Sequence, residues 1–518
     1  MKKSTILFLF TILTTQLFAQ APVIQWEKSY GGSSNEVARC IIPTFDGGYA
    51  VAGNTSSNDS MVTGHHASLD FWVIKIDAFG NLQWQKDLGG LYNDQAFSIV
   101  QTPDSGYAVS GTSESNDGDA SGNHAFGLGD YWLVKLNSAG VLQWQKCYGG
   151  TSFDNGYQVI NTTDGGFAFI GAGGSQDGDM NNLYGGNDFW LVKTDDTGHI
   201  EFQKVFGGGS GDYGYSLVQA NDGGYVMTGM TLSNNIDVNG NHGGNDYWVV
   251  KCNDTGMFVW QTCLGSTGGD NARWITKSND GGFVVVGSAG ENDGNVTGFN
   301  GTYDYWAVKL DALGTIVWQK CFGGWNDDKA YGVTPTIDGG FAVLGFAMSG
   351  DTSITGNHGN NHDYWLVKLD ANGNKQWEHA YGGQGDEDGY SVIQISDGSY
   401  VMAGNSNGAQ GDVSHGLGQA DFWVVKLGPA GGNSVNELKE NKSVIVYPNP
   451  VSEQLSVDSK QLTVNTISIT DISGREIFHS AINHKSEIIN LKSFSSGIYF
   501  LKVELADGSS TIKKFVKE

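Results

Sequence analysis

Hydrophobic and polar residues alternate in short runs along most of the chain, and glycine-rich turns separate the runs. Residues 94–102, 106–112, 130–136 and 141–149 form one set of four such runs, rich in β-branched and aromatic side chains. Alternation with a period of two residues is typical of β-strands that bury one face. No stretch shows the 3.6-residue period of an amphipathic helix. The pattern predicts an all-β fold.

The set of four runs is repeated, and one phrase marks each repeat. The phrase is an Asp, an aromatic residue, a Trp and, three residues later, a Lys. It occurs seven times at intervals of 58–60 residues, with the Trp at Trp72, Trp132, Trp190, Trp248, Trp306, Trp365 and Trp423. Four antiparallel strands in a period of this length predict the blade of a β-propeller. In that fold we expect the Trp to pack against the next blade, and the Asp to accept backbone hydrogen bonds.

The two ends of the repeat region predict a closed ring. Residues 24–32 match the fourth run of a repeat but have no earlier runs to pair with, and residues 421–427 form a third run with no fourth run after it. The N-terminal run would complete the last blade as its outermost strand, which leaves no open sheet edge. We therefore predict a seven-bladed β-propeller over residues 20–427.

Residues 1–19 have the features of a secretory signal peptide: Lys2 and Lys3, an apolar run, and Ala19 at the end. This run is too short to span a bilayer, and no later run reaches about 20 apolar residues. The sequence therefore predicts an exported chain without a transmembrane segment. Three of the five Cys residues occupy equivalent positions in different repeats, so we expect the Cys residues to be buried and unpaired.

Acidic residues outnumber basic ones, which gives a net charge of −26. Such a chain repels phosphate backbones, so nucleic acid is not an expected partner. A carboxylate opens the first run of every repeat, and Ala or Gly follows two residues later. The carboxylates are Glu36, Asp94, Asp154, Asp212, Asp270, Asp328 and Glu387. They would either ring one mouth of the central channel as ligand-binding residues or each bind its own turn, and the local role is the one we expect.

The next position breaks the symmetry of the ring. Five repeats carry an aromatic residue there, and two carry Arg39 and Arg273. The aromatic residues are Phe97, Tyr157, Tyr215, Tyr331 and Tyr390. A bound ligand breaks ring symmetry, so Arg39 and Arg273 are candidate ligand-binding residues. The alternative is that each guanidinium stacks on a neighbouring ring or pairs with an acid.

The long loop between the second and third runs is rich in Asp, Asn and Gly. Asp117, Asp119, Asp177 and Asp179 are candidate Ca²⁺ ligands because calcium prefers oxygen atoms. The distal Glu of an EF-hand is missing, and Asp-Gly loops are also ordinary turn chemistry. No His in these loops has clear ligand spacing with a Cys or a carboxylate, so zinc is not expected. No other cofactor and no catalytic constellation is recognised, and we expect a protein that is not an enzyme.

Composition changes after a linker over residues 428–443. Residues 444–518 have balanced charge, no Trp, and six or seven short strand-like runs, which predict a small β-sandwich. Four motifs follow one another there. Their key residues are Tyr447, Pro448, Asn449 and Pro450, then Asp471, Gly474 and Arg475, then Gly497 and Tyr499, and finally Lys513 and Lys514.

In this order these motifs resemble the type A C-terminal sorting domain of the type IX secretion system of the Bacteroidetes. The resemblance implies that residues 444–518 engage the type IX secretion machinery. It also implies that the chain crosses the outer membrane and is then released or attached to the cell surface. Residues 20–427 resemble the repeat propellers often found beside this domain, a likeness that names no activity.

Taken together, the sequence predicts a secreted or cell-surface propeller that acts as a non-catalytic binding or adhesion module for an extracellular glycan or protein. One alternative is an extracellular glycan hydrolase or lyase that uses loop carboxylates, and another is a purely structural surface protein. An enzyme should have one repeat whose loops depart from the others and carry a convergent pair of acids.

Overall fold

The computed structural model describes residues 20–125, 127–348, 354–359, 361–430, 444–447, 450–459, 463–471, 475–506 and 510–517. The predicted signal peptide lies outside these ranges, as do residues 431–443 of the predicted linker and Pro448, Asn449 and Gly474 of the sorting motifs. The chain divides into two compact units, Met1–Gly431 and Gly432–Glu518. Within the described residues, no helix is long and apolar enough to cross a membrane.

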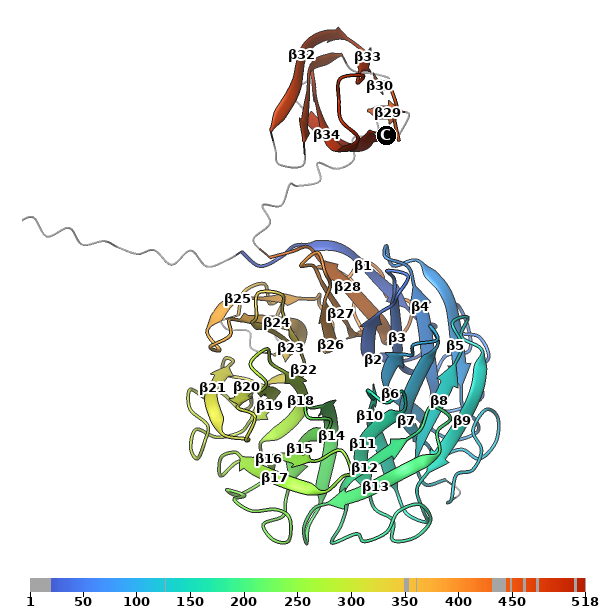
Figure 1. Ribbon diagram of the computed structural model, residues 1–518, viewed down its shortest axis with the longest axis vertical. Coiled ribbons are helices and arrows are strands. Elements are labelled where there is room, and N and C mark those ends of the chain that lie inside the picture. The colour runs from blue at the N-terminus through green and yellow to red at the C-terminus, as the bar shows by residue number, and fades with distance from the viewer. Residues whose placement is uncertain are drawn as a thin grey trace, which may run out of the picture. The chain divides into compact units, whose positions relative to one another are not determined.

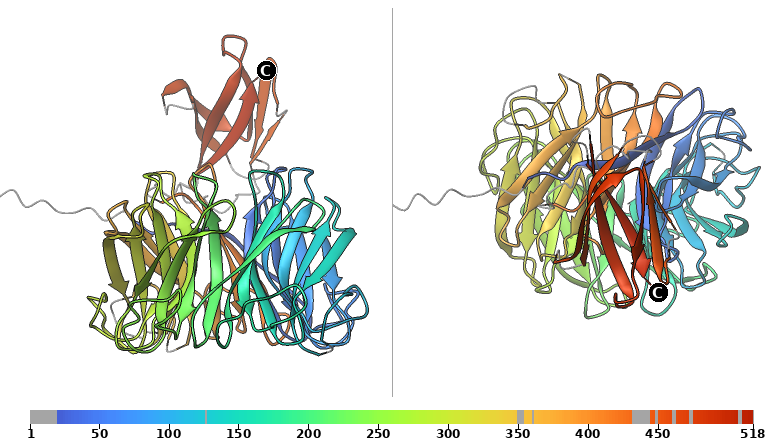
Figure 2. Two further views of the ribbon diagram at one scale, coloured as in Figure 1. Left: turned by 60° about the horizontal axis from the view of Figure 1, so that its bottom comes forward. Right: turned by 90° about the horizontal axis from the view of Figure 1, so that it is seen from above.

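Seven four-stranded antiparallel sheets are arranged around a common axis in the first unit (Figure 1; Figure 2 gives two further views). Six of the sheets follow chain order from the axis outward. They are β2 (Glu36–Pro43), β3 (Tyr49–Thr55), β4 (Asp70–Ile76) and β5 (Leu82–Leu88); β6 (Asp94–Gln101), β7 (Tyr107–Ser113), β8 (Asp130–Leu136) and β9 (Leu142–Tyr148); β10 (Asp154–Asn161), β11 (Phe167–Gly173), β12 (Asp188–Thr194) and β13 (Ile200–Phe206); β14 (Asp212–Gln219), β15 (Tyr225–Thr231), β16 (Asp246–Cys252) and β17 (Phe258–Leu264); β18 (Asn271–Lys277), β19 (Phe283–Ala289), β20 (Asp304–Leu310) and β21 (Ile316–Phe322); and β22 (Asp328–Pro335), β23 (Phe341–Ala347), β24 (Asp363–Leu369) and β25 (Lys375–Tyr381).

The seventh sheet closes the ring with strands from both ends of the repeat region. Its order is β1-β28-β27-β26, formed by β1 (Ile24–Tyr30), β28 (Asp421–Leu427), β27 (Tyr400–Ser406) and β26 (Glu387–Gln394). β1 runs antiparallel to β28, with Ile24 opposite Leu427. The predicted seven-bladed propeller and its closure by the N-terminal strand are both confirmed.

Aromatic contacts join every blade to the next, as predicted for the recurrent Trp. All seven Trp side chains are at most 1% exposed. Each Trp ring centre lies 4.5–4.7 Å from an aromatic ring of the adjacent blade, and the pair between Trp72 and Phe422 closes the circle. Each indole N–H donates to a Gln or Glu in the outermost strand of its own blade at 2.7–2.9 Å. These contacts make the Trp a structural residue of the ring.

The Asp and Lys of the repeated phrase also have structural partners. In all seven blades, the Asp accepts a hydrogen bond of 2.6–2.9 Å from a backbone N–H of the loop before it, as expected. In six blades, the Lys forms an ion pair of 2.5–3.0 Å with the Asp of the turn that joins the first two strands. The whole phrase therefore stabilises the blade.

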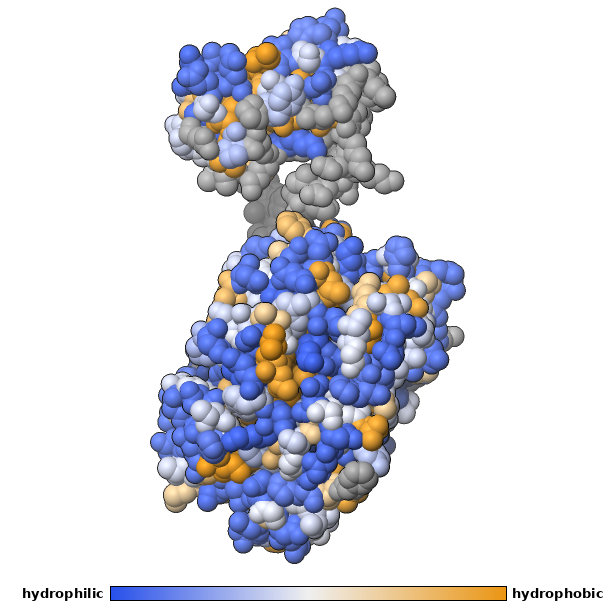
Figure 3. Space-filling view, turned by 90° about the vertical axis from the view of Figure 1, so that its right-hand side faces the viewer, coloured by the Kyte–Doolittle hydropathy of each residue, from blue (hydrophilic) through white to orange (hydrophobic). Residues whose placement is uncertain are grey.

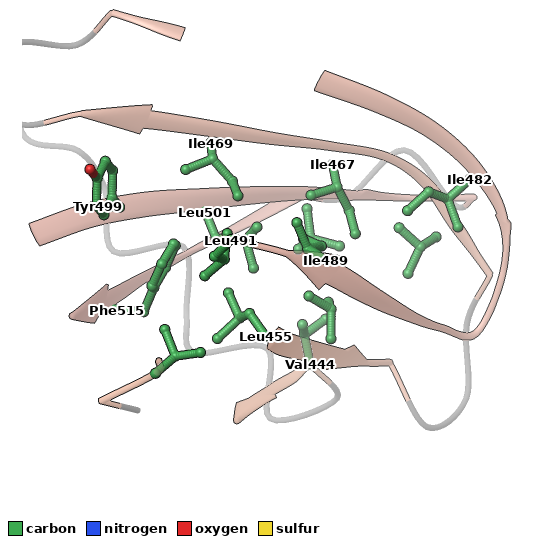
Figure 4. Close-up of a cluster of buried hydrophobic side chains, with 14 of the residues drawn as sticks. Val444, Leu455, Ile467, Ile469, Ile482, Ile489, Leu491, Tyr499, Leu501 and Phe515 are labelled. Carbon is green, nitrogen blue, oxygen red and sulfur yellow. The ribbon is translucent and has the colours of Figure 1, made fainter. Parts of the chain in front are cut away.

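The second unit contains two sheets that share one apolar core (Figure 4). One sheet has the order β29-β30-β33, and the other has the order β32-β31-β34-β35. The strands are β29 (Ile445–Tyr447), β30 (Gln454–Asp458), β31 (Val464–Asp471), β32 (Glu476–His484), β33 (Ser486–Asn490), β34 (Gly497–Leu505) and β35 (Ser510–Lys517). Leu455, Ile467, Leu501 and Phe515 are fully buried in this core. The predicted small β-sandwich is confirmed.

Candidate functional site

The carboxylates that open the first strand of each blade are fully buried and bind their own loops. All seven have no exposed surface. Each accepts a hydrogen bond of 2.6–2.9 Å from a backbone N–H of the loop that precedes its strand. Burial raises the pKa of one of them, Asp94, to about 6. The geometry therefore supports the local role of these carboxylates and leaves them no surface on which to contact a ligand.

Each blade contributes one side chain to a ring at the axis, and this ring consists of the two propeller arginines and five aromatic residues. The guanidinium carbon of Arg39 lies 4.3 Å from the ring centre of Tyr390, and that of Arg273 lies 4.6 Å from the ring centre of Tyr215. Tyr157 joins the two arcs, because its ring centre is 4.9 Å from that of Tyr215 and 5.0 Å from that of Phe97. The ring encloses a cavity of about 130 Å³. Both arginines therefore stack on neighbouring rings.

Arg273 also borders a second, more polar cavity of about 190 Å³ between the fifth and sixth blades. Asn271, Ser288, Tyr303 and Lys329 line it beside Arg273. The ammonium nitrogen of Lys329 lies 4.5 Å from the ring centre of Tyr303 and 2.8 Å from an oxygen of Asp327. Two cations and several hydrogen-bond donors thus surround one small space, which suits an anionic or oxygen-rich group.

Sequence reasoning found Arg273 but missed Lys329 and Asn271. The signal was present in the repeats. Lys329 follows the buried carboxylate of its strand, where the other blades carry Val, Gln, Asn, Tyr, Asn or Asp. Lys329 is therefore the only cation at this position, and it stands in the blade next to Arg273.

The four aspartates predicted as calcium ligands are divided between separate loops. Asp117 accepts a hydrogen bond from the backbone of Leu91, and Asp177 accepts two from Thr151. Asp119 and Asp179 lie 3.7–3.8 Å from His66 and His124, respectively. These contacts are turn chemistry and loop pairing, and they do not gather the four carboxylates around one ion.

A different group has the spacing of metal ligands. Among the described residues, one set of three His, Cys, Asp or Glu side chains places its ligand atoms within 4.8 Å of one another: His65, Asp70 and Asp87. The sequence predicts no zinc site, and neither His65 nor Asp87 is among its candidate residues. His65 lies in a loop and Asp87 at the end of an outer strand, 22 residues apart, so only the fold brings them together.

All five Cys are unpaired; Cys40, Cys252 and Cys263 are buried, and Cys147 and Cys321 are partly buried.

The face shown in Figure 3 is mostly hydrophilic, and its hydrophobic residues form small separate groups. The described residues of that face therefore form no extended apolar surface for docking.

The sorting motifs of the second unit occupy strands and turns of the sandwich. Tyr499 is 8% exposed, and its hydroxyl donates to the carbonyl of Ser495 at 2.7 Å. Arg475 is an exposed residue whose Nε lies 3.1 Å from Asp471. Tyr447 is half exposed. On the backbone of β35, Lys513 and Lys514 lie opposite Leu501 and Phe500, and Gly497 lies opposite Lys517.

Comparison with known proteins assigns the second unit to a family. Residues 445–518 match the secretion system C-terminal sorting domain. Fold and family together define an exported β-propeller with a C-terminal sorting domain. The chain is a cargo protein of the type IX secretion system, and its sorting domain implies interaction with that machinery and export to the cell surface or the extracellular space.

Solved structures match at low identity, and no curated protein matches the chain. The extracellular domain of a putative hybrid two-component system from B. thetaiotaomicron is 10% identical, with a TM-score of 0.43 over 96% of this chain and 60% of that one. PorZ, a surface component of the type IX secretion system of Porphyromonas gingivalis, is 11% identical, with a TM-score of 0.27 over 96% and 75%. The Pan2 WD40 domain of Neurospora crassa is 10% identical, with a TM-score of 0.33 over 60% and 86%. The chain thus spans 60% of the first of these structures, and its fold assignment rests on its own strand topology.

Proposed function

We propose that the propeller is a non-catalytic binding module for an extracellular glycan or protein, and that the cavity between Arg273 and Lys329 receives an anionic group of that ligand. The observation that carries this proposal is the pairing of two cations beside polar donors at the axis, in adjacent blades. The chain has a net charge of −26, which opposes non-specific attraction of polyanions. An anionic ligand would therefore depend on local contacts with these two residues.

The enzyme alternative predicts an accessible pair of acids in one divergent blade. The first blade does hold a close pair, Asp70 and Asp87, but their exposed fractions are 0% and 1%. Their ligand atoms lie within 4.8 Å of each other, whereas the carboxyl groups of glycosidases are about 5–9.5 Å apart and flank an accessible substrate. This geometry favours binding over glycan hydrolysis.

Export gives the binding module its place of action. We propose that the chain belongs to a bacterium of the Bacteroidetes and that a signal peptide over residues 1–19 directs its translocation across the inner membrane. We also propose that the propeller then acts on the outer surface or after release. A binding role fits both destinations, because neither the cavity nor the blade junctions depend on attachment.

Affinity electrophoresis and calorimetry on the full chain would test the binding role. The ligands would be polygalacturonate and alginate, with dextran as the neutral comparison and a panel of extracellular matrix proteins. We expect binding to an acidic ligand to fall at least tenfold in Arg273→Gln and in Lys329→Gln, because each removes one of the two cations. Lys277→Gln is the matched control, since Lys277 is an exposed cation at the far end of the same strand, β18.

Three results would contradict the proposal. The first is that no glycan or protein in the panel binds. The second is that binding is unchanged in Arg273→Gln and Lys329→Gln. The third is an equal loss in Lys277→Gln, which would show that overall charge, not the cavity, controls the affinity.

A further inference from the structure

The first blade contains a buried group of one imidazole and two carboxylates that is not repeated among the described residues of the other blades. Asp70 is the first residue of β4, Asp87 is near the end of β5, and His65 lies in the loop that leads to β4. Nδ1 of His65 lies 3.0 Å from Oδ2 of Asp70 and 3.6 Å from Oδ2 of Asp87. The side chain of His65 is 9% exposed, and both carboxylates have no exposed side-chain surface.

Several polar atoms of this group lack hydrogen-bond partners, whereas Oδ2 of Asp70 accepts from the backbone N–H of His66 at 2.7 Å. Both oxygens of Asp87 and Nδ1 of His65 are buried without a partner in the part of the chain that the structure describes. Oδ1 of Asp70 is also without one, as is the same atom of the equivalent Asp in the other six blades. A buried carboxylate without a partner is costly, and native proteins rarely keep one without a reason. Asp87 therefore occupies a position where a carboxylate is unfavourable unless a cation accompanies it.

The other blades provide an internal comparison for both unusual residues. Asp87 pairs with Trp72 across the strands. At the equivalent place the other six blades carry Cys147, Val205, Cys263, Cys321, Ala380 and Ser29. At the place of His65, three blades carry an Asn, and two of these, Asn123 and Asn241, donate to backbone carbonyls of their own loop. Two departures from the repeat thus occur in one blade, and their side chains face each other.

We propose that His65, Asp70 and Asp87 bind one divalent transition-metal ion, with Zn²⁺ as the best fit, through Nδ1 of the imidazole and one oxygen of each carboxylate. Tetrahedral zinc with ligand bonds of about 2.0–2.2 Å holds its ligand atoms about 3.3–3.6 Å apart. The separation of 3.6 Å matches this spacing, and the separation of 3.0 Å is slightly shorter than it. Calcium needs six to eight oxygen ligands, so one imidazole and two carboxylates suit it poorly.

The open side of the group faces His66. Nδ1 of His66 lies 3.3 Å from Asp70 Oδ2 and 3.7 Å from Asp87 Oδ1, and the His66 side chain is 30% exposed. Solvent therefore reaches the group at this partly exposed imidazole. A fourth ligand would come from His66 or from water. A bound ion would join the loop over residues 56–69 to β4 and β5, so we assign it a structural role in the first blade.

The test is zinc binding by the full chain after its metal has been removed with a chelator. Calorimetry would measure the stoichiometry, Co²⁺ substitution would report tetrahedral coordination by its absorption, and thermal unfolding would report stabilisation by Zn²⁺ and by Ca²⁺. Asp87→Asn removes a ligand charge at constant size. His65→Asn introduces the residue that the second, fourth and sixth blades carry. His242→Asn is the matched control, because His242 is the counterpart of His66 in the fourth blade, where Cys263 stands in place of Asp87.

We expect one Zn²⁺ per chain with a rise in the unfolding midpoint, and at least a hundredfold loss of affinity in Asp87→Asn and in His65→Asn. His242→Asn should bind as the wild type does, and Ca²⁺ should not raise the midpoint through this site. The near-ultraviolet circular dichroism of each variant would show that it is folded. Zinc binding of the same strength and stoichiometry in both ligand variants would overturn the proposal, as would a folded wild-type chain that does not bind zinc.

Discussion

A tyrosine hydroxyl reaches across four of the seven blade junctions, and its removal tests how the ring is held together. In the junction between the fourth and fifth blades, the hydroxyl of Tyr247 donates to the backbone carbonyl of Trp306 at 3.0 Å. Three junctions have Phe71, Phe189 or Phe422 in the same place. Their rings lie at the same distance from the neighbouring Trp as the Tyr rings do. Tyr247→Phe therefore removes a hydrogen bond without disturbing the packing.

The expected loss follows from the burial of this hydroxyl. Tyr247 has no exposed surface, and burial raises its pKa well above the ordinary value, so the donor stays protonated at every pH in use. A net hydrogen bond contributes about 0.5–1.5 kcal/mol, and a carbonyl left without a partner costs about 1–3 kcal/mol. We expect Tyr247→Phe to lower the free energy of unfolding by about 1–2 kcal/mol. At about 2.1 cal/mol/K per residue over about 400 residues, this corresponds to a Tm lower by about 1–2 °C.

Urea unfolding followed by Trp fluorescence, together with calorimetry, would measure this loss on the full chain. The m-value should not change, because the same surface is exposed on unfolding. Tyr213→Phe is the control, since Tyr213 is partly exposed on β14. A loss below about 0.3 kcal/mol would show that the hydroxyl contributes nothing, and a loss above about 3 kcal/mol would refute the claim that Phe fits this junction.

Three further predictions concern pH, closure and export. Burial raises the pKa of Asp188 and Asp304 to about 7. The stability that these two groups contribute is therefore complete below pH 4 and is lost as the pH rises through 7. Tm in metal-free buffer should fall between pH 5 and pH 8, and a smaller fall in Asp188→Asn would confirm the cause. Glu27→Ala removes the acceptor of the Trp423 indole at 2.9 Å and should cost about 1–3 kcal/mol in urea unfolding, whereas Glu27→Gln, the side chain used in five other blades, should cost little. Deletion of residues 445–518 should keep the propeller inside the cell envelope; its appearance in the culture medium on cell fractionation would contradict the assigned export route.

The fold could be predicted from the sequence because the same pattern of strands and turns occurs in every repeat. Seven copies of a buried Trp at a constant spacing report blade number, and an unpaired run at each end of the repeat region reports closure. The orientation of Glu36 and its counterparts could not be read in the same way. A carboxylate before a small residue is compatible with a channel lining and with a loop contact, and only the observed hydrogen bonds decide between them.

The candidate sites were harder to predict because they lie where blades differ. His65 and Asp87 belong to a loop and to the end of an outer strand, so neither local spacing nor alternation places them together. Lys329 and Arg273 lie on neighbouring blades, 56 residues apart. A position-by-position comparison of the seven repeats does single out His65, Asp87 and Lys329 as exceptions. In a repeat protein, the exceptions are where the sequence carries information about ligands, and their chemistry depends on the fold that brings them together.

The order of strands in the seventh blade also determines how the propeller bears mechanical load. In the other blades the last strand along the chain is the outermost one, with a neighbour on one side. β28 instead lies between β1 and β27, and it is hydrogen-bonded to both over its length. Tension applied through the chain after Leu427 therefore pulls on an inner strand, and extraction must shear two ladders at once instead of peeling one edge. The N-terminal strand thus reinforces the one point at which the sorting domain is attached.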